Sequence, residues 1–443
     1  MARSVNVDVK YLTRVEGHGN IVVNVKDGIV EECRLDIVEA PRFFEAMLRG
    51  RSIFEAQHIT SRICGICACG HTISSIAAAE DAIGFTPSEQ TTKLRKILLY
   101  QEMLDSHILH IYLLVAPDLL GVPSFVPLID THGNVVKRAL RMKKACNDVC
   151  AVLAGRHIHP ISSIVGGFTK IPGEKELDAM LDILYDMRPD MDSTVELIKT
   201  LAPAIPVFER ETEYVALVTD DDEYPTLEGD LGSSDGLRLD KSEYLKITNE
   251  FVMPHSSAKH AKASRKSYMT GALARFNINS EKLNPKAKAV ADALGMKPPI
   301  INPYMNTAAQ LVECMHYMEE SIAILEDLKA NGTDQSEAIT VGLNERNDIK
   351  VNKGLGVGAV EVPRGLLFHS YEVDETGKIE NANCIIPTSQ NVNNIEHDMS
   401  KLIHEILDKP DEEITLMFEM LVRAYDPCIS CSAHFLDVEF INR

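Results

Sequence analysis

The chain carries RICGICACGH at residues 62–71 and DPCISCSAH at residues 426–434. Each stretch contains a Cys-x-x-Cys pair followed closely by a histidine. A Cys-x-x-Cys turn directs two thiolates toward one soft metal ion, and two such turns supply four sulfur ligands. The two pairs are about 360 residues apart, so sharing a metal requires closure of a very long loop, at a cost in chain entropy. We therefore expect the fold to be organised around the meeting of these stretches.

Composition and charge restrict the class of protein. The chain has 443 residues, 45% of them hydrophobic and 25% charged, as in globular proteins with a large core. Its net charge of −20 argues against nucleic acid or an anionic membrane surface as a partner. The first ten residues lack the pattern of a signal peptide, and no apolar run predicts a membrane span. We expect a cytoplasmic location, where clustered cysteines more often serve metal or redox chemistry than disulfides.

The hydrophobic pattern predicts a mainly α (α+β) fold in a single large domain, residues 1–443. We expect an N-terminal β segment (1–40), a helical body (41–350) and a C-terminal β and helical segment (351–443) that delivers the second cysteine motif. A hairpin turn is predicted at residues 26–28 (KDG).

Within these segments, residues 219–240 have the composition of a solvated loop. Pro189 should bend or break the helix that contains it. The longer helices are predicted over 88–120, 134–153, 174–201, 304–330, 397–407 and 412–425, and strands are expected over 357–379.

Ligand chemistry alone leaves three kinds of metal site open. A structural zinc site is the commonest use of paired Cys-x-x-Cys motifs, although its halves usually lie within tens of residues of each other. An iron–sulfur cluster is a second possibility, although its cysteines are usually close in sequence too. A catalytic site with soft metals would explain the polar residues that accompany the cysteines. These are Arg62, His71, Asp426, His434 and the arginine of PRG at 363–365.

The ordered set of motifs resembles the large subunit of nickel–iron hydrogenases. Besides the two cysteine motifs, the resemblance rests on RVEGH at 14–18, SHILH at 106–110, HP at 159–160, VGG at 165–167, PRG at 363–365 and PT at 387–388. Within that family the chain is most similar to the cytoplasmic, bidirectional, multi-subunit branch, which includes sulfhydrogenases and NAD(P)-linked enzymes. The stretches that indicate this branch are PRFFE at 41–45, EFVMPHSSAKH at 250–260 and RAYDPC at 423–428.

The resemblance implies a fold with a central bundle of long helices and small peripheral β-sheets. It also implies a catalytic subunit that cleaves dihydrogen reversibly and heterolytically at a nickel–iron centre carrying carbon monoxide and cyanide. Four cysteines would bind nickel, as suits soft thiolates and a metal that changes oxidation state. Cys64 and Cys428 would be terminal nickel ligands, and Cys67 and Cys431 would also bind the iron.

Other residues take roles around this centre by the same resemblance. Glu16 would be the first carrier in the proton exit path, which is general acid–base work. Arg364 would lie over the metals, held in place by Asp118 and Asp426.

Two residues would support the ligands of the centre. Thr388 would donate a hydrogen bond to a cyanide. His71 would contact a bridging cysteine from outside the metal ligands.

A second metal site is implied near the end of the chain. Glu45, His434 and a backbone carbonyl near Cys384 would hold magnesium or iron, and a carboxylate and a carbonyl suit a hard cation. The family is usually made as a precursor that a maturation protease cuts after the histidine equivalent to His434. The residues that follow here, 435–443, are therefore either a maturation tail or a retained end.

Electrons would leave through other subunits. The sequence has no further cysteine array and no Gly-x-Gly-x-x-Gly fingerprint after a strand. The implied partners are a small subunit with iron–sulfur clusters and further subunits that bind flavin or NAD(P).

Three alternatives of other classes were weighed against the hydrogenase interpretation. A hydrogen-sensing regulatory subunit would keep the same ligands, and a metal-stapled scaffold without catalysis would bind zinc. A respiratory quinone-site subunit shares the fold but lacks the nickel ligands, which are present here.

Overall fold

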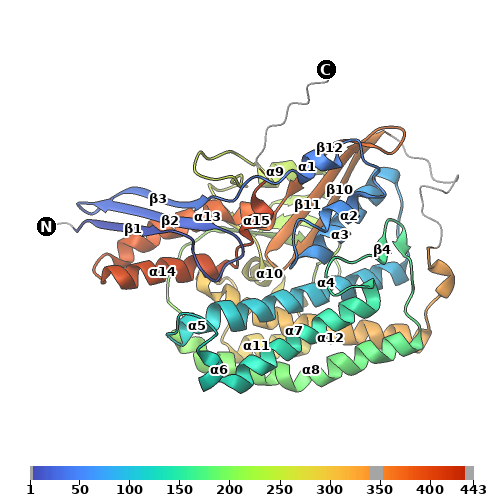
Figure 1. The fold of residues 1–443 in the computed structure, drawn as a ribbon, viewed down its shortest axis with the longest axis horizontal. Coiled ribbons are helices and arrows are strands. Elements are labelled where there is room, and N and C mark those ends of the chain that lie inside the picture. The colour runs from blue at the N-terminus through green and yellow to red at the C-terminus, as the bar shows by residue number, and fades with distance from the viewer. Residues whose placement is uncertain (1–2, 340–352, 435–443) are drawn as a thin grey trace.

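The computed structural model describes residues 3–339 and 353–434, and begins with a small antiparallel sheet (Figure 1). Its strands β1 (Val5–Val9), β2 (Gly19–Lys26) and β3 (Ile29–Ile37) are paired in chain order. Asp27 and Gly28 both have positive φ, 48° and 78°, as a two-residue hairpin turn that matches the twist of the strands requires. The predicted N-terminal hairpin is confirmed.

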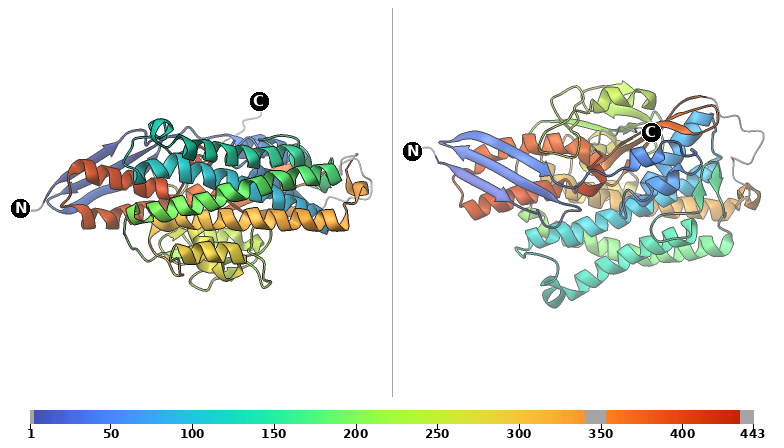
Figure 2. Two further views of the ribbon diagram at one scale, coloured as in Figure 1. Left: turned by 90° about the horizontal axis from the view of Figure 1, so that it is seen from below. Right: turned by 45° about the horizontal axis from the view of Figure 1, so that its top comes forward.

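Four long helices form the body of the molecule and run side by side (Figures 1 and 2). They are α4 (Glu89–Leu109), α7 (Gly133–Ala154), α8 (Glu174–Leu201) and α12 (Asn306–Asn331). Helices α4 and α12 are buried on almost every face of their central turns, as expected for helices inside a large protein. The predicted helical bundle is confirmed, and α8 continues through Pro189 without a break.

The end of the predicted helix over 88–120 is less regular than expected. After α4 the chain forms a π-helical segment, His110–Val115, and then the short helix α5 (Ala116–Leu119), with Pro117 near its start. A π-helical turn inserts residues into a helix and rotates everything that follows it.

The prediction of a solvated loop over 219–240 is wrong, because part of this stretch forms strands. β7 (Asp230–Ser233) and β8 (Arg238–Leu239) join β6 (Glu213–Val218) and β9 (Tyr268–Met269) in a sheet of order β8-β7-β6-β9. The strands are very short and the turns between them are rich in Asp and Gly, so no alternating pattern was visible.

The C-terminal part contains a second meander. β10 (Gly354–Val362), β11 (Gly365–Val373) and β12 (Ile379–Ile385) pair antiparallel, as the sequence predicted for this stretch. Helix α13 (Pro387–Ile406) begins ten residues before the predicted start at 397. Its first turns are rich in Ser, Asn and Gln that are buried and hydrogen-bonded, so the sequence lacked the apolar period of a helix.

The remaining elements connect these layers. They are α1 (Phe44–Leu48), α2 (Ala56–Thr60), α3 (Ala68–Ile83), α6 (Leu128–Thr131), β4 (Ser163–Ile164), β5 (Gly167–Phe168), α9 (Tyr244–Thr248), α10 (Ala272–Asn279), α11 (Pro285–Ala293), α14 (Asp411–Ala424) and α15 (Ile429–Ser432). Among the helices within 3–339 and 353–434, none is long and apolar enough to cross a membrane.

Helix α3, which starts directly after Cys67, lies unusually close to strand β10. A Cβ on Gly358 would come 2.0 Å from the carbonyl oxygen of Ser74, and one on Gly356 would come 2.1 Å from that of Ala78. Only glycine allows the backbones of helix and strand to approach this closely. The first cysteine motif is therefore positioned by backbone contact with the C-terminal meander.

We predict that Gly358→Ala lowers the free energy of unfolding by about 1–3 kcal/mol, because the added methyl group meets a backbone carbonyl that cannot move aside. Denaturant unfolding of the chain measures this. Gly354→Ala, in the same strand but with nothing within 4 Å of the new Cβ, is the matched control. Equal stability of the two variants would show that the close approach does not constrain α3.

Candidate metal centre

The two cysteine motifs meet in the structure. The sulfur atoms of Cys64, Cys67, Cys428 and Cys431 lie within 4.8 Å of one another, and all four residues are buried. Cys428 Sγ is 3.6 Å from Cys64 Sγ and 2.7 Å from Cys431 Sγ. Cys67 precedes α3 and Cys428 precedes α15, so two helix starts bring the motifs together.

This donor set fits a soft metal. A metal–sulfur bond of about 2.3 Å allows two sulfurs on one ion to be at most about 4.6 Å apart, and the separations of 3.6 Å and 2.7 Å lie within that limit. Hydrogen bonds from the thiols of Cys428, Cys431 and Cys67 lower the pKa of Cys64 well below its usual value. Hydrogen bonding within the quartet raises the pKa of Cys428, and burial raises that of Cys431. Metal binding would release the thiol protons of the quartet.

Glu16 contacts the second cysteine motif directly. Its Oε2 accepts hydrogen bonds from Cys428 Sγ at 3.2 Å and from the backbone N–H of Ser430 at 3.0 Å. The Ser430 hydroxyl donates to Oε1. The backbone of Glu16 also forms a parallel bridge with Cys428. Glu16 is only half-buried, so its carboxylate lies between a buried thiol and the protein exterior.

Arg364 lies at the tip of the two-residue turn between β10 and β11. Its Nη2 donates to Asp426 Oδ1 at 2.8 Å and its Nε to the Asp426 carbonyl at 2.5 Å, while Nη1 donates to Ser106 Oγ at 3.2 Å. Burial opposes its charge, but Asp426 and the neighbouring cysteine sulfurs raise the pKa of Arg364 well above its usual value. A small cavity separates Arg364 from Cys67 and Cys428. The guanidinium is a fixed cation beside the sulfur cluster.

Asp118 does not hold Arg364, contrary to the sequence prediction. Its carboxylate pairs with Arg14 Nη2 at 2.5 Å and with Arg423 Nε at 2.8 Å. These partners belong to the N-terminal loop and to α14, so Asp118 is engaged away from Arg364. Because Arg14 is two residues from Glu16, Asp118 braces the segment that carries Glu16.

His71 and Thr388 line the same cavity as Arg364. His71 Nδ1 is 3.0 Å from His369 Nε2, a hydrogen-bond partner that the sequence did not suggest. Burial lowers the pKa of His71 to about 4, so the ring is neutral. Thr388 Oγ1 accepts the backbone N–H of Cys428 at 2.9 Å, and this leaves the Thr388 hydroxyl proton free to donate.

The residues predicted for a second metal site are His434, Glu45 and Cys384, and the ring of Phe44, next to Glu45 in the chain, is 6.4 Å from that of His434. Both ring nitrogens of His434 are buried and have no hydrogen-bond partner among the described residues, and burial lowers its pKa to about 3. Glu45 Oε1 accepts the backbone N–H of Cys384 at 2.9 Å, and burial raises the pKa of Glu45. A buried neutral imidazole without a hydrogen-bond partner fits a metal ligand. Cys384 therefore contacts Glu45 through its backbone, whereas its thiol lies 3.5 Å from His369 Nδ1.

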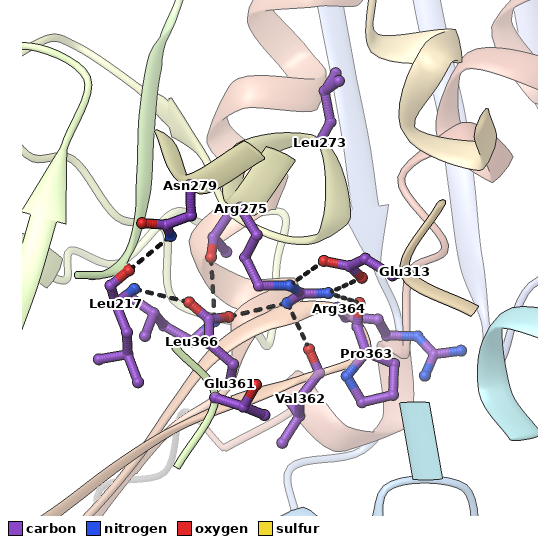
Figure 3. A network of polar contacts seen from close by, with 12 residues as sticks. Leu217, Leu273, Arg275, Asn279, Glu313, Glu361, Val362, Pro363, Arg364 and Leu366 are labelled. Carbon is purple, nitrogen blue, oxygen red and sulfur yellow. Dashed lines mark hydrogen bonds and ion pairs between the residues drawn. The ribbon is translucent and has the colours of Figure 1, made fainter. Parts of the chain in front are cut away.

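A buried network of ion pairs beside the site was not predicted from the sequence (Figure 3). Arg275 donates to both oxygens of Glu313 at 2.6 Å and to Glu361 Oε2 at 2.9 Å. It also donates to the carbonyls of Val362 at 2.9 Å and Pro363 at 3.3 Å. Through these two carbonyls Arg275 is attached to the turn that presents the next residue, Arg364. The available signal was an arginine within the apolar stretch GALARF at 271–276.

We predict that Arg275→Met destabilises the chain by about 3–5 kcal/mol, because Glu313 and Glu361 stay buried without their cation. Both the midpoint temperature of thermal unfolding and the rate of dihydrogen-dependent dye reduction should be lower than in wild type. Arg238→Met is the control, since Arg238 also pairs with two carboxylates but is exposed, where such pairs contribute about 0–1 kcal/mol. Similar losses in both variants would contradict the role of the buried network.

The chain is similar in sequence to known protein families and relatives. The sequence family described as nickel-dependent hydrogenase matches residues 42–128 and 244–434, and one described as HoxL-like matches residues 6–40. Sulfhydrogenase 1 subunit alpha of Pyrococcus furiosus is 33% identical over 428 residues, covering 97% of both chains. The chain belongs to the nickel-dependent hydrogenase family. Sulfhydrogenase 2 subunit alpha of the same organism is 31% identical, over 97% of this chain and 99% of the relative.

Solved structures agree with this hydrogenase assignment. An NAD+-reducing [NiFe]-hydrogenase in the hydrogen-reduced state superposes with a TM-score of 0.86 at 28% identity, covering 97% of this chain and 99% of that one. A Ni-Fe-Se hydrogenase from Desulfomicrobium baculatum, 23% identical, shares the fold with a TM-score of 0.77, over 97% and 100% of the two chains. The predicted large-subunit fold is confirmed, and the chain is the hydrogenase subunit that carries the metal-binding cysteines.

Proposed function

We propose that this hydrogenase subunit cleaves dihydrogen reversibly and heterolytically, and passes the electrons to an iron–sulfur partner subunit. The observation that carries the proposal is the buried cluster of four sulfurs with Glu16 on one side and Arg364 on the other. A proton acceptor and a fixed cation flank the same soft-metal site. A structural zinc staple would need neither of them.

The cysteines would divide the metals as follows. Cys64 and Cys428 would be terminal nickel ligands, and Cys67 and Cys431 would hold nickel and iron together. When bound, the nickel–iron centre supplies the redox-active site at which dihydrogen is split. The lowered pKa of Cys64 and the shared hydrogen bonds of the quartet support thiolate ligation.

Glu16 would take the proton from Cys428. The thiol already donates to Glu16 Oε2 at 3.2 Å, and the N–H of Ser430 holds the carboxylate in this orientation. A half-buried carboxylate can turn from a thiol toward water, which makes Glu16 a general base for one step and an acid for the next.

Arg364 and Thr388 would bind the anionic ligands of the centre. The raised pKa of Arg364 makes it a permanent cation and a poor base, so its contribution would be electrostatic. The free hydroxyl proton of Thr388 would donate to a cyanide in the cavity, with carbon monoxide as the neutral co-ligand. Asp426 would keep the guanidinium over the cluster.

Magnesium or iron would occupy the second site, held by His434, Glu45 and a backbone carbonyl near Cys384. The unpartnered nitrogens of His434 support this assignment. The predicted tail, residues 435–443, lies outside the described residues. We retain a maturation protease as a partner of the newly made chain, on the resemblance alone.

The relatives indicate the kind of electron acceptor. One similar structure is an NAD+-reducing enzyme and two similar chains are sulfhydrogenase subunits. We therefore propose further flavin or NAD(P)-binding subunits beyond the iron–sulfur partner, and a cytoplasmic location.

The test is dihydrogen oxidation with a viologen dye by the complex isolated without oxygen. Wild type should turn over rapidly, which a hydrogen sensor would not do. Glu16→Gln should lower the rate about 10²–10⁴-fold, because glutamine cannot take the proton. Nickel content should be unchanged, since glutamine keeps the size of the side chain.

Glu31→Gln, on an exposed position of β3, is the control and should keep full activity. Wild-type protein that contains nickel yet does not oxidise dihydrogen would refute the catalytic proposal. Full activity of Glu16→Gln would refute the proton role of Glu16 alone.

A further inference from the structure

A further cluster of side chains that can bind metal lies outside the two metal sites proposed above. His255 Nε2 is 2.8 Å from Glu396 Oε1, and His260 Nε2 is 3.2 Å from Glu396 Oε2. One atom from each of the three residues lies within 4.8 Å of the others. The histidines belong to the stretch 250–260, to which the hydrogenase chemistry assigns no metal ligand.

The fold builds this cluster from two rigid parts. The backbones of Phe251 and His260 exchange hydrogen bonds at 2.8 Å, which closes the loop that carries both histidines. Glu396 projects from the middle of α13, and its Oε1 accepts the backbone N–H of Leu35 in β3 at 2.9 Å. β3 packs along α13 (Figure 1). All three donors are therefore fixed by backbone before any ion binds.

Burial and charge favour a cation here over a simple hydrogen-bonded cluster. His260 is 1% exposed, and the Glu396 side chain is 13% exposed. Within residues 3–339 and 353–434, no Lys or Arg pairs with Glu396, so its side-chain partners are the two imidazoles and its backbone partner is the N–H of Leu35. His260 Nδ1 is buried without a partner in the same part of the chain, so the ring is anchored only on the side facing Glu396. A buried carboxylate is stabilised by a paired charge or a metal.

We infer that His255, His260 and Glu396 bind a divalent cation of the zinc class. Two imidazoles and one carboxylate are typical zinc ligands and leave a fourth position for water. Magnesium and calcium prefer oxygen ligands throughout, which this cluster does not supply. The His255 side chain is 17% exposed, which gives an ion access from solvent.

The ion would join the loop to α13. Glu396 lies eight residues after Thr388, about 12 Å along the helix at a rise of about 1.5 Å per residue. Thr388 accepts the backbone N–H of Cys428, so α13 extends from the sulfur cluster to the proposed cation. Lys259, which precedes His260 in the sequence, pairs with Glu250 at 2.8 Å. Zinc here would act as a structural staple at a distance from the reacting atoms.

The experiment uses the whole enzyme complex, purified without an affinity tag and without oxygen, incubated with zinc chloride and then desalted. Elemental analysis measures zinc and nickel in the same sample. Wild type should retain about one zinc per chain, and Glu396→Gln and His255→Gln should each lose zinc by about tenfold or more. His404→Gln and Glu405→Gln, exposed on the same helix, are the controls and should keep it.

X-ray absorption at the zinc edge gives an independent answer on wild type. Nitrogen and oxygen neighbours without sulfur would support the site. Zinc that has sulfur neighbours only, that persists in Glu396→Gln, or that wild type does not retain would overturn it. The nickel content of these samples reports separately on the proposed hydrogenase function, so the two proposals fail in different ways.

Discussion

Four cysteine sulfur atoms from opposite ends of the chain form one buried cluster, and the packing of the fold holds them together. Cys64 and Cys428 are separated by 364 positions, yet their sulfurs are 3.6 Å apart. Two backbone devices achieve this. Glycines in β10 let α3 approach the C-terminal meander, and the bridge between Glu16 and Cys428 attaches the second motif to the N-terminal loop. Each device joins segments remote in sequence, so the loop-closure entropy is offset by packing over the whole chain.

A layer of buried charges surrounds the sulfur cluster. Arg364 lines the cavity and pairs with Asp426. Arg275 contacts the turn that carries Arg364 and pairs with Glu313 and Glu361 (Figure 3). Buried ion pairs of this kind cost desolvation energy and seldom add net stability. Their value here is geometric, because the Arg275 guanidinium joins the carboxylates of Glu313 and Glu361 to two carbonyls of the turn, those of Val362 and Pro363. A site that must place a cation beside developing charge benefits from such preorganisation.

The sequence predicted what depends on local chemistry or on short spacing. The Cys-x-x-Cys pairs, the Asp27-Gly28 hairpin and the long apolar helices could all be recognised, and the motif order indicated the family. Asp118 was given the wrong partner because its arginine partners, Arg14 and Arg423, are remote in sequence and no local pattern indicates them. The start of α13 was missed because its buried side chains are polar. Arg275 was missed because its partners come from two remote segments, α12 and the end of β10 with the turn after it, and no local pattern marks a tertiary network.

The central claim is that the four cysteines hold nickel, and the most direct test is the nickel, iron and zinc content of the complex isolated with its partners and without oxygen. The account predicts about one nickel per chain, with sulfur neighbours at the nickel absorption edge that decrease in Cys428→Ser. Cys33→Ser, a half-buried cysteine outside the cluster, should leave nickel unchanged. Zinc with sulfur neighbours, in protein without nickel, would contradict the account.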